Sequence, residues 1–205
     1  SFSVGYPTTN GAYQSAFGGG STDICISKFS ANGSSLLYST YIGGSDNENP
    51  HSLIVNDNDE LYLMGSSGSN NFPTTNGSYD ITFNGGDSWG FINYGSGFYV
   101  TYPNGIDIIV TKFSSSGNNL IASTFVGGTK NDGINESGAN TYTSAGLCNF
   151  YADEYRGEIN LDNQGNCYIA STTNSLDFPT INASQSSNGG LQDAVIFQLD
   201  QNLSN

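Results

Sequence analysis

The side chains that could do chemistry in this sequence are mainly carboxylates and aromatic rings, because the chain holds only one histidine and three cysteines. Paired carboxylates catalyse glycoside hydrolysis, and Asp153, Glu154 and Glu158 lie close together. Any acidic loop offers as much. A Ser-His-Asp triad would have to use His51, and the sequence has no Gly-x-Ser-x-Gly elbow. The sequence therefore favours a protein that is not an enzyme.

Aromatic side chains gather in two glycine-rich or acidic stretches, near residues 86–105 and 129–156. Flat rings supply a large contact area at a small entropic cost, which suits binding of a sugar or of a protein partner. The candidate binding residues are Trp89, Phe91, Tyr94, Tyr99, Tyr102, Tyr151, Asp153, Glu154 and Tyr155. The alternative is that these rings form a small core that fixes two long loops.

Two oxygen-rich segments, 46–49 and 56–60, raise the question of Ca²⁺, which takes six to eight oxygen ligands. Neither segment follows an ordered calcium-loop pattern, and the second occupies a predicted hairpin turn, where Asn and Asp are favoured on backbone grounds. A zinc site needs more His and Cys than the chain has. The sequence therefore predicts no cofactor, with calcium as the alternative.

The charge balance excludes some partners. Four Lys and Arg face 18 Asp and Glu, which gives a net charge of −14. No basic stripe is present to neutralise nucleic-acid phosphates or an anionic membrane surface. No apolar run approaches the ~18 residues that a membrane span needs. Gly, Asn and Ser make up two fifths of the chain, but 13% aromatic residues argue against disorder and for a loop-rich β protein.

The chain repeats itself. Residues 23–30 (DICISKFS) return as 107–114 (DIIVTKFS), and 36–44 (LLYSTYIGG) return as 120–128 (LIASTFVGG), at the same spacing along the chain. Residues 72–79 (FPTTNGSY) repeat 6–13 (YPTTNGAY). Ordered signatures that recur together indicate a repeat architecture.

Each repeat predicts four short strands, at 23–29, 35–42, 52–55 and 60–64 in the first copy, separated by turn residues. The strands have apolar residues on both faces: in the second copy, for example, Ile108 and Val110 alternate with Ile109. Both faces must therefore be covered. Because no helical segment is available, the cover must be another sheet, as in the stacked blades of a β-propeller.

This order of motifs resembles the SBBP (seven-bladed β-propeller type) repeat of bacterial secreted and cell-surface proteins. The residues that carry the resemblance are Asp23, Lys28, Phe29, 38–44, Tyr62, Gly65 and 72–79. The last copy departs from it, with Gln198 and Leu199 in place of Lys and Phe. The resemblance implies a partial propeller of four-stranded antiparallel blades, with no catalytic residues.

The resulting organisation has four parts. These are the end of a preceding blade (1–22), a blade unit (23–83), a blade unit with insertions near 86–105 and 129–156 (84–192), and the first strand of a further blade (193–205). Both insertions follow connections that reach the same end of the blades, so we expect them to decorate one face.

These features predict a non-catalytic module of a secreted or surface-exposed bacterial protein. By analogy with the family that it resembles, the protein would be a cargo of type IX secretion. It would act as a scaffold, in adhesion, or as a surface for a protein partner or glycan, beside the remaining blades of a longer chain. The alternative is a carbohydrate-active enzyme or glycan-binding propeller that uses the two insertions.

Overall fold

The computed structural model describes residues 4–93, 98–135 and 157–205. Regular elements in this part of the chain are all β-strands, and no helix there is long and apolar enough to cross a membrane. The strands are β1 (Ile24–Phe29), β2 (Leu36–Ile42), β3 (Glu48–Val55), β4 (Leu61–Ser67), β5 (Trp89–Asn93), β6 (Phe98–Tyr102), β7 (Asp107–Phe113), β8 (Leu120–Val126), β9 (Glu158–Leu161), β10 (Cys167–Thr173) and β11 (Asp193–Leu199).

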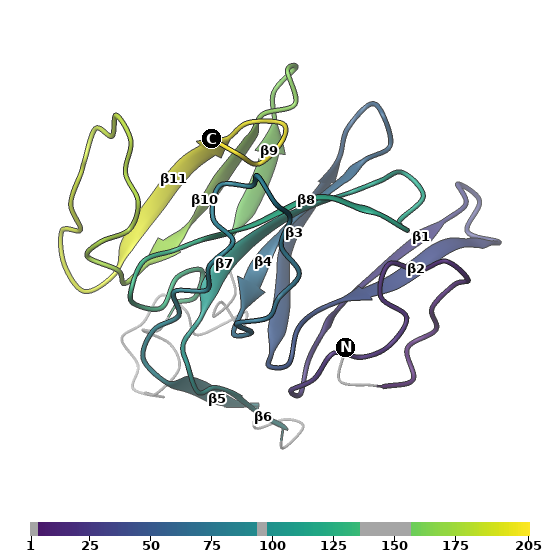
Figure 1. The fold of residues 1–205 in the computed structure, drawn as a ribbon, viewed down its shortest axis with the longest axis horizontal. Coiled ribbons are helices and arrows are strands. Elements are labelled where there is room, and N and C mark those ends of the chain that lie inside the picture. Colours follow the sequence, from purple (N-terminus) through teal and green to yellow (C-terminus); the bar gives the residue numbers. More distant parts are fainter. Residues whose placement is uncertain (1–3, 94–97, 136–156) are drawn as a thin grey trace.

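The strands form antiparallel sheets, none of which closes into a barrel (Figure 1). A two-stranded sheet holds β1 and β2, a four-stranded sheet has the order β3-β4-β7-β8, and a three-stranded sheet has the order β11-β10-β9. The separate β5–β6 hairpin belongs to the first insertion. The all-β, antiparallel class that the sequence predicts is confirmed.

The sheets are offset by two strands from the units in which the sequence repeats. The four-stranded sheet takes β3 and β4 from unit 23–83 and takes β7 and β8 from unit 84–192. The chain crosses between sheets after β2, not at the boundaries drawn from the sequence. A repeat can be cut at any of its four connections, and only the hydrogen bonds show which of them leaves the sheet.

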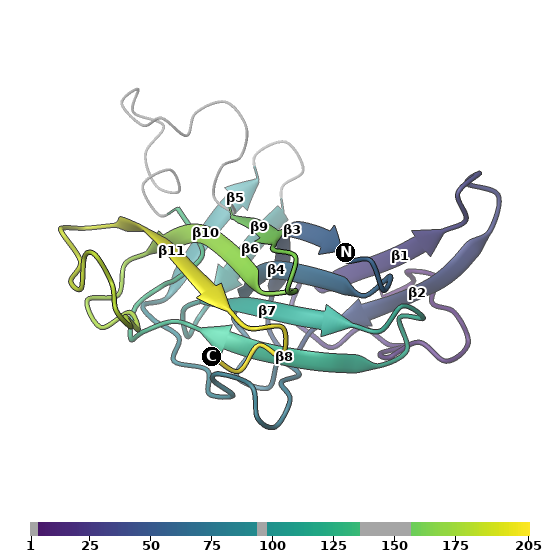
Figure 2. The same ribbon diagram turned by 90° about the horizontal axis from the view of Figure 1, so that it is seen from above.

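The two-faced strands pack sheet on sheet, as their sequence predicts (Figure 2). Leu61 and Leu63 of β4 belong to the core cluster shared with β1 and β2. Their neighbours Tyr62 and Met64 belong to the cluster shared with β9, β10 and β11. Because successive side chains of a strand point to opposite faces, one strand supplies both cores.

The segments with the Pro-Thr motif pack on the strands that follow them. Tyr6 meets Tyr41 of β2 edge to face, with ring centroids 5.7 Å apart, and its repeat counterpart Phe72 meets Phe125 of β8 at 6.0 Å. Edge-to-face contacts of this kind stabilise aromatic pairs beyond their buried area. The sequence repeat is thus also a repeat of contacts.

The two ends of the strands differ. The turns β1–β2, β3–β4, β7–β8 and β9–β10 point to one end of the molecule, at the upper side of Figure 1, and β5–β6 lies at the opposite end. This placement agrees with the expectation for the first insertion. Most of the second insertion, 136–156, lies outside the described residues.

Candidate functional site

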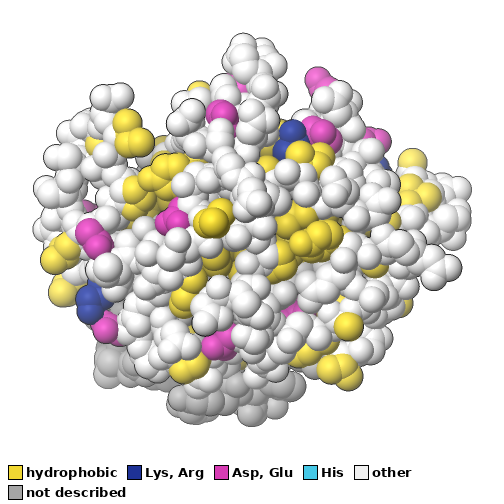
Figure 3. All heavy atoms as spheres, in the orientation of Figure 1, with side chains coloured by type: hydrophobic (Ala, Val, Ile, Leu, Met, Phe, Trp, Pro, Cys, Tyr) yellow, Lys and Arg dark blue, Asp and Glu magenta, His cyan; other side chains and the backbone are white. Residues whose placement is uncertain are grey.

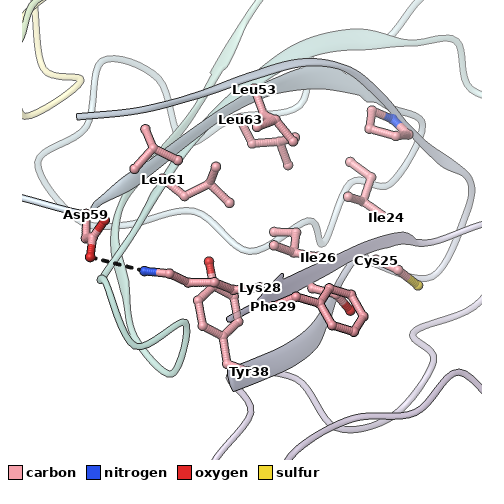
Figure 4. A pocket seen from close by; sticks show the side chains of 13 residues that line it. Ile24, Cys25, Ile26, Lys28, Phe29, Tyr38, Leu53, Asp59, Leu61 and Leu63 are labelled. Carbon is pink, nitrogen blue, oxygen red and sulfur yellow. Dashed lines mark ion pairs between the residues drawn. The ribbon is translucent and has the colours of Figure 1, made fainter. Parts of the chain in front are cut away.

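A groove of about 530 Å³ runs between β1 and the β3–β4 hairpin (Figure 4). Ile24, Ile26 and Lys28 line it from β1. Leucines face them from the other side: Leu53 on β3, and Leu61 and Leu63 on β4. Its walls are therefore largely apolar, with Lys28 and Asp59 at one end. Figure 3 shows that hydrophobic side chains also reach the surface elsewhere, so exposure alone does not mark a site.

The repeat identifies this groove as an incomplete version of an interface that is complete one repeat further along. Leu53 and Val55 of β3 are 60% and 49% exposed. Their counterpart on β9, Ile159, pairs with Ile169 just as Leu53 pairs with Leu63, yet Ile159 is only 6% exposed. The same structural position is thus covered in one repeat and open in the other.

Side chains of the four-stranded sheet provide the cover in the complete interface. Tyr62 and Met64 of β4 are fully buried against Ile159, Cys167 and Ile169. The Tyr62 hydroxyl also reaches the backbone carbonyl of Gly165 in the β9–β10 turn, at 3.4 Å. Strand β4 therefore fills the groove of the next sheet.

A lysine stands at the same place in both interfaces. The Lys28 ammonium lies 3.3 Å from Asp59 of the β3–β4 turn. Its counterpart Lys112 lies 2.9 Å from Glu60 and sits over the Tyr62 ring, 5.1 Å from the centroid. Burial opposes protonation of Lys112, but the contacts with Glu60 and Tyr62 together outweigh it and raise the pKa of Lys112.

Buried carboxyl pairs form a second repeated feature, at the end of the sheets opposite the turns. Asp107 accepts hydrogen bonds from the backbone N–H groups of Asn84 (2.6 Å) and Gly85. Asp132 accepts them from the Gly128 N–H (2.7 Å) and the Ser175 hydroxyl (2.9 Å). The pair thus holds the segment that precedes β5 through Asp107, and it holds the segments that follow β8 and β10 through Asp132.

The first copy of the repeat contains the same arrangement. Asp23 accepts from the Gly18 N–H at 2.6 Å, and Glu48 accepts from the Gly44 N–H at 3.0 Å and from the Ser67 hydroxyl at 2.7 Å. A Cβ added at Gly43 would lie 2.6 Å from carboxyl atoms of both acids. The Gly-Gly motif thus exists because the carboxyl pair occupies the space beside it.

Burial changes the acidity of these groups. Loss of solvation raises the pKa of Glu48 and of Asp107 to about 8, and that of Asp132 to about 6. It raises the pKa of Asp23 as well. Hydrogen bonds from side-chain hydroxyls and backbone N–H groups oppose the shift without cancelling it. At neutral pH each pair therefore retains at least one proton.

The predicted aromatic site is only partly visible. Trp89 and Tyr102 pack against each other, with centroids 5.7 Å apart, inside a cluster with Val100, Ile106 and Ile134. Both are buried, at 7% and 0% exposure, so their rings form a small core in this part of the structure. The backbones of Phe91 and Tyr99 lie in β5 and β6. Tyr94, Tyr151, Asp153, Glu154 and Tyr155 lie outside the described residues.

The oxygen-rich segments have structural tasks. The Asn47 side-chain oxygen accepts from the N–H groups of Ser21 and Thr22, and the Asn56 side-chain oxygen accepts from those of Asn58 and Glu60. The described residues contain no group of three or more His, Cys, Asp or Glu suited to a metal ion. Calcium binding stays an untested alternative.

His51 lies at a register irregularity of the β3–β4 pair, where its Nε2 is 3.1 Å from the Ser66 hydroxyl. Loss of solvation lowers the pKa of His51 to about 3, so the ring is neutral at physiological pH. His51 is half-buried and contacts Ser66 of β4 through Nε2, which suits a structural histidine.

Sequence reasoning missed both the open groove and the carboxyl pairs. The pairs had a signal, since Asp23 and Glu48 recur as Asp107 and Asp132 at the spacing of the repeat. The groove had none, because it arises from which strands pair. In comparisons with known proteins, no family model and no curated protein matched the sequence.

Proposed function

We propose that the chain is a non-catalytic repeat module of the β-propeller type, whose role is to scaffold and to bind a partner. The observation that carries this proposal is that one set of contacts occurs twice. The sheet-on-sheet core, the lysine at the turn and the carboxyl pair are all rebuilt one repeat further along the chain. A catalytic centre is normally a single unrepeated constellation, whereas a stacking device repeats.

The roles of the acidic groups support the same proposal. Glu48, Asp107 and Asp132 are buried, and each accepts a hydrogen bond from a backbone N–H group, so these acids hold backbone segments in place. An acid that served glycoside hydrolysis would instead face a cleft open to substrate. We assign the protein to the bacterial cell surface or to the secreted fraction by the resemblance of its repeat, and type IX secretion is the proposed export route.

The test has two parts. An antibody to the chain, applied to fractions of the source bacterium, should detect the protein in the medium or on intact cells in a protease-sensitive form. A panel of oligosaccharides incubated with the purified protein should show no turnover. Recovery from the cytoplasm would overturn the location, and glycan hydrolysis abolished by Glu154→Gln would overturn the non-catalytic assignment.

A further inference from the structure

Strand β1 has an open hydrogen-bonding edge among the described strands. It pairs only with β2, whereas its repeat counterpart β7 pairs with β8 on one side and with β4 on the other. An open edge presents backbone N–H and C=O groups to any extended strand of matching register. The edge borders the groove, so a strand that paired with β1 would also place side chains over the exposed Leu53 and Val55.

The β4–β7 pair defines what such a strand must carry. In that pair Tyr62 lies opposite Lys112, and Met64 lies opposite Val110. The corresponding positions on β1 are Lys28 and Ile26, at the spacing of the repeat. A matching strand therefore brings a tyrosine opposite Lys28 and a methionine or similar side chain opposite Ile26.

Charge points to the same occupant. In the complete interface the acidic residue Glu60, two positions before the tyrosine, binds Lys112. Lys28 instead forms an ion pair with Asp59, whose side chain is 69% exposed. An incoming carboxylate would join this pair on the open side, since the Lys28 side chain is 32% exposed. The groove is thus apolar with the Lys28–Asp59 ion pair at one end, and Lys28 complements an acidic residue two positions before a tyrosine.

We propose that the β1 edge and its groove bind a β-hairpin of the β3–β4 class, supplied by a further unit of the same repeat. Its inner strand pairs antiparallel with β1 and carries the pattern acidic, apolar, tyrosine, apolar, methionine, glycine. The tyrosine covers Leu61 and Val55, as Tyr62 covers Cys167 and Leu161. This inference rests on the proposed stacking function and names the partner of the stack.

The test uses the purified 205-residue protein and a labelled cyclic peptide of residues 52–67, closed by a two-residue turn so that the hairpin is formed before binding. We expect saturable binding measured by fluorescence anisotropy. A peptide with Tyr62→Ser and Met64→Ser should bind at least about tenfold more weakly, because it loses the two anchors that fill the groove. The backbone pairing groups are the same in both peptides.

A charge reversal tests the register. Lys28→Glu in the protein should weaken binding of the parent peptide, and a Glu60→Lys peptide should recover affinity for this variant only. Lys130→Glu is the matched control, since Lys130 pairs with Asp87 away from the groove. It should leave peptide binding unchanged.

Three outcomes would overturn the proposal: no saturable binding of the cyclic hairpin, equal affinity for the Tyr62→Ser, Met64→Ser peptide, or no recovery in the charge-reversal pair. Dimerisation of the protein through β1, seen by sedimentation and lost in Lys28→Glu, would assign the groove to a second copy instead. These results involve only purified components, so they leave the cellular location and the lack of turnover to their own tests.

Discussion

Buried carboxyl pairs define the chemistry of this protein at the scale of single residues. Each pair holds two segments of backbone beside a Gly-Gly motif, and each has acids whose pKa is raised by loss of solvation. A carboxyl that is protonated in the folded state and ionised in the unfolded state makes folding take up a proton. The stability of the protein should therefore depend on pH in a defined direction.

We expect the free energy of unfolding to fall as pH rises from about 4.5 to about 8. Glu48 has a folded pKa of about 8 against an ordinary value of 4.5, so its contribution is fully present below the ordinary value and is lost as pH rises through the folded one. Each such group changes stability by at most about 1.4 kcal/mol per pH unit. Urea unfolding at a series of pH values measures the slope.

Glu48→Gln and Asp107→Asn should flatten this slope, because an amide keeps the shape of the protonated acid and cannot ionise. The gain relative to the parent should be largest near pH 8. Asp57→Asn in the exposed β3–β4 turn is the control and should leave the slope unchanged. A parent slope that is flat between pH 5 and pH 8 would contradict the assignment of the protons.

The Gly-Gly motif offers a second test at this scale. A Cβ at Gly127 would lie 2.6 Å from an Asp107 oxygen and 2.9 Å from an Asp132 oxygen. Gly127→Ala should therefore destabilise the protein by about 1–3 kcal/mol, the usual cost of overpacking. Gly190→Ala, where no atom lies within 4 Å, should have a much smaller effect in the same thermal unfolding measurement. Equal effects would show that the carboxyl pair can move aside.

At the scale of elements, the β5–β6 hairpin is anchored by its own small core. Trp89 contacts Tyr102 in a cluster with Ile106 and Ile134, and the Asn47 amide donates to the Thr101 carbonyl at 2.6 Å. The Asn49 amide also donates to the Tyr102 hydroxyl. The hairpin is thus tied to β3 and its approach, close to the first carboxyl pair.

Trp89→Ala should therefore cost stability, by about 3–5 kcal/mol if the whole fold feels the cavity and by less if only the hairpin opens. Hydrogen exchange of β5 and β6 separates these cases. Ile181→Ala, at a side chain that is 76% exposed, is the control. Unchanged stability and exchange would show that the ring is available for surface binding, as the glycan hypothesis requires.

At the scale of the whole molecule, the sheets form a linear series. The four-stranded sheet shares one core with β1 and β2 and a separate core with β9, β10 and β11. In such an array each unit is stabilised mainly by its neighbours. Damage to one interface should therefore remain local.

Ile169→Ala tests this arrangement. Its side chain is fully buried between the four-stranded and three-stranded sheets, so its loss should raise hydrogen exchange in β9, β10 and β11 more than in β1 and β2. Ile26→Ala, in the other core, should give the reverse pattern. A uniform rise across all sheets in both variants would indicate a single cooperative unit instead of a stack.

The sequence by itself determined the repeated strands and their two-faced character, although β3 begins at Glu48, before the predicted 52–55, and the β5–β6 pair was not predicted. The predicted strands 23–29 and 35–42 match β1 and β2 within one residue at each end, because turn residues bound them on both sides. Successive side chains of a strand point to opposite faces, and apolar residues occupy both faces of these strands. This was enough to predict that each sheet is covered by another sheet.

Only the tertiary structure decided which strands share a sheet, where the groove lies and which acids meet. Hydrogen bonds between β4 and β7 join two sequence units, and this pairing is set by contacts between segments far apart in the chain, which local pattern does not encode. The same pairing leaves β1 with an open edge and brings Asp107 beside Asp132. Trp89 and Tyr102 show why the sequence could not decide between a binding surface and a core. Their residue types suit both equally, and only their burial in the structure distinguishes the two.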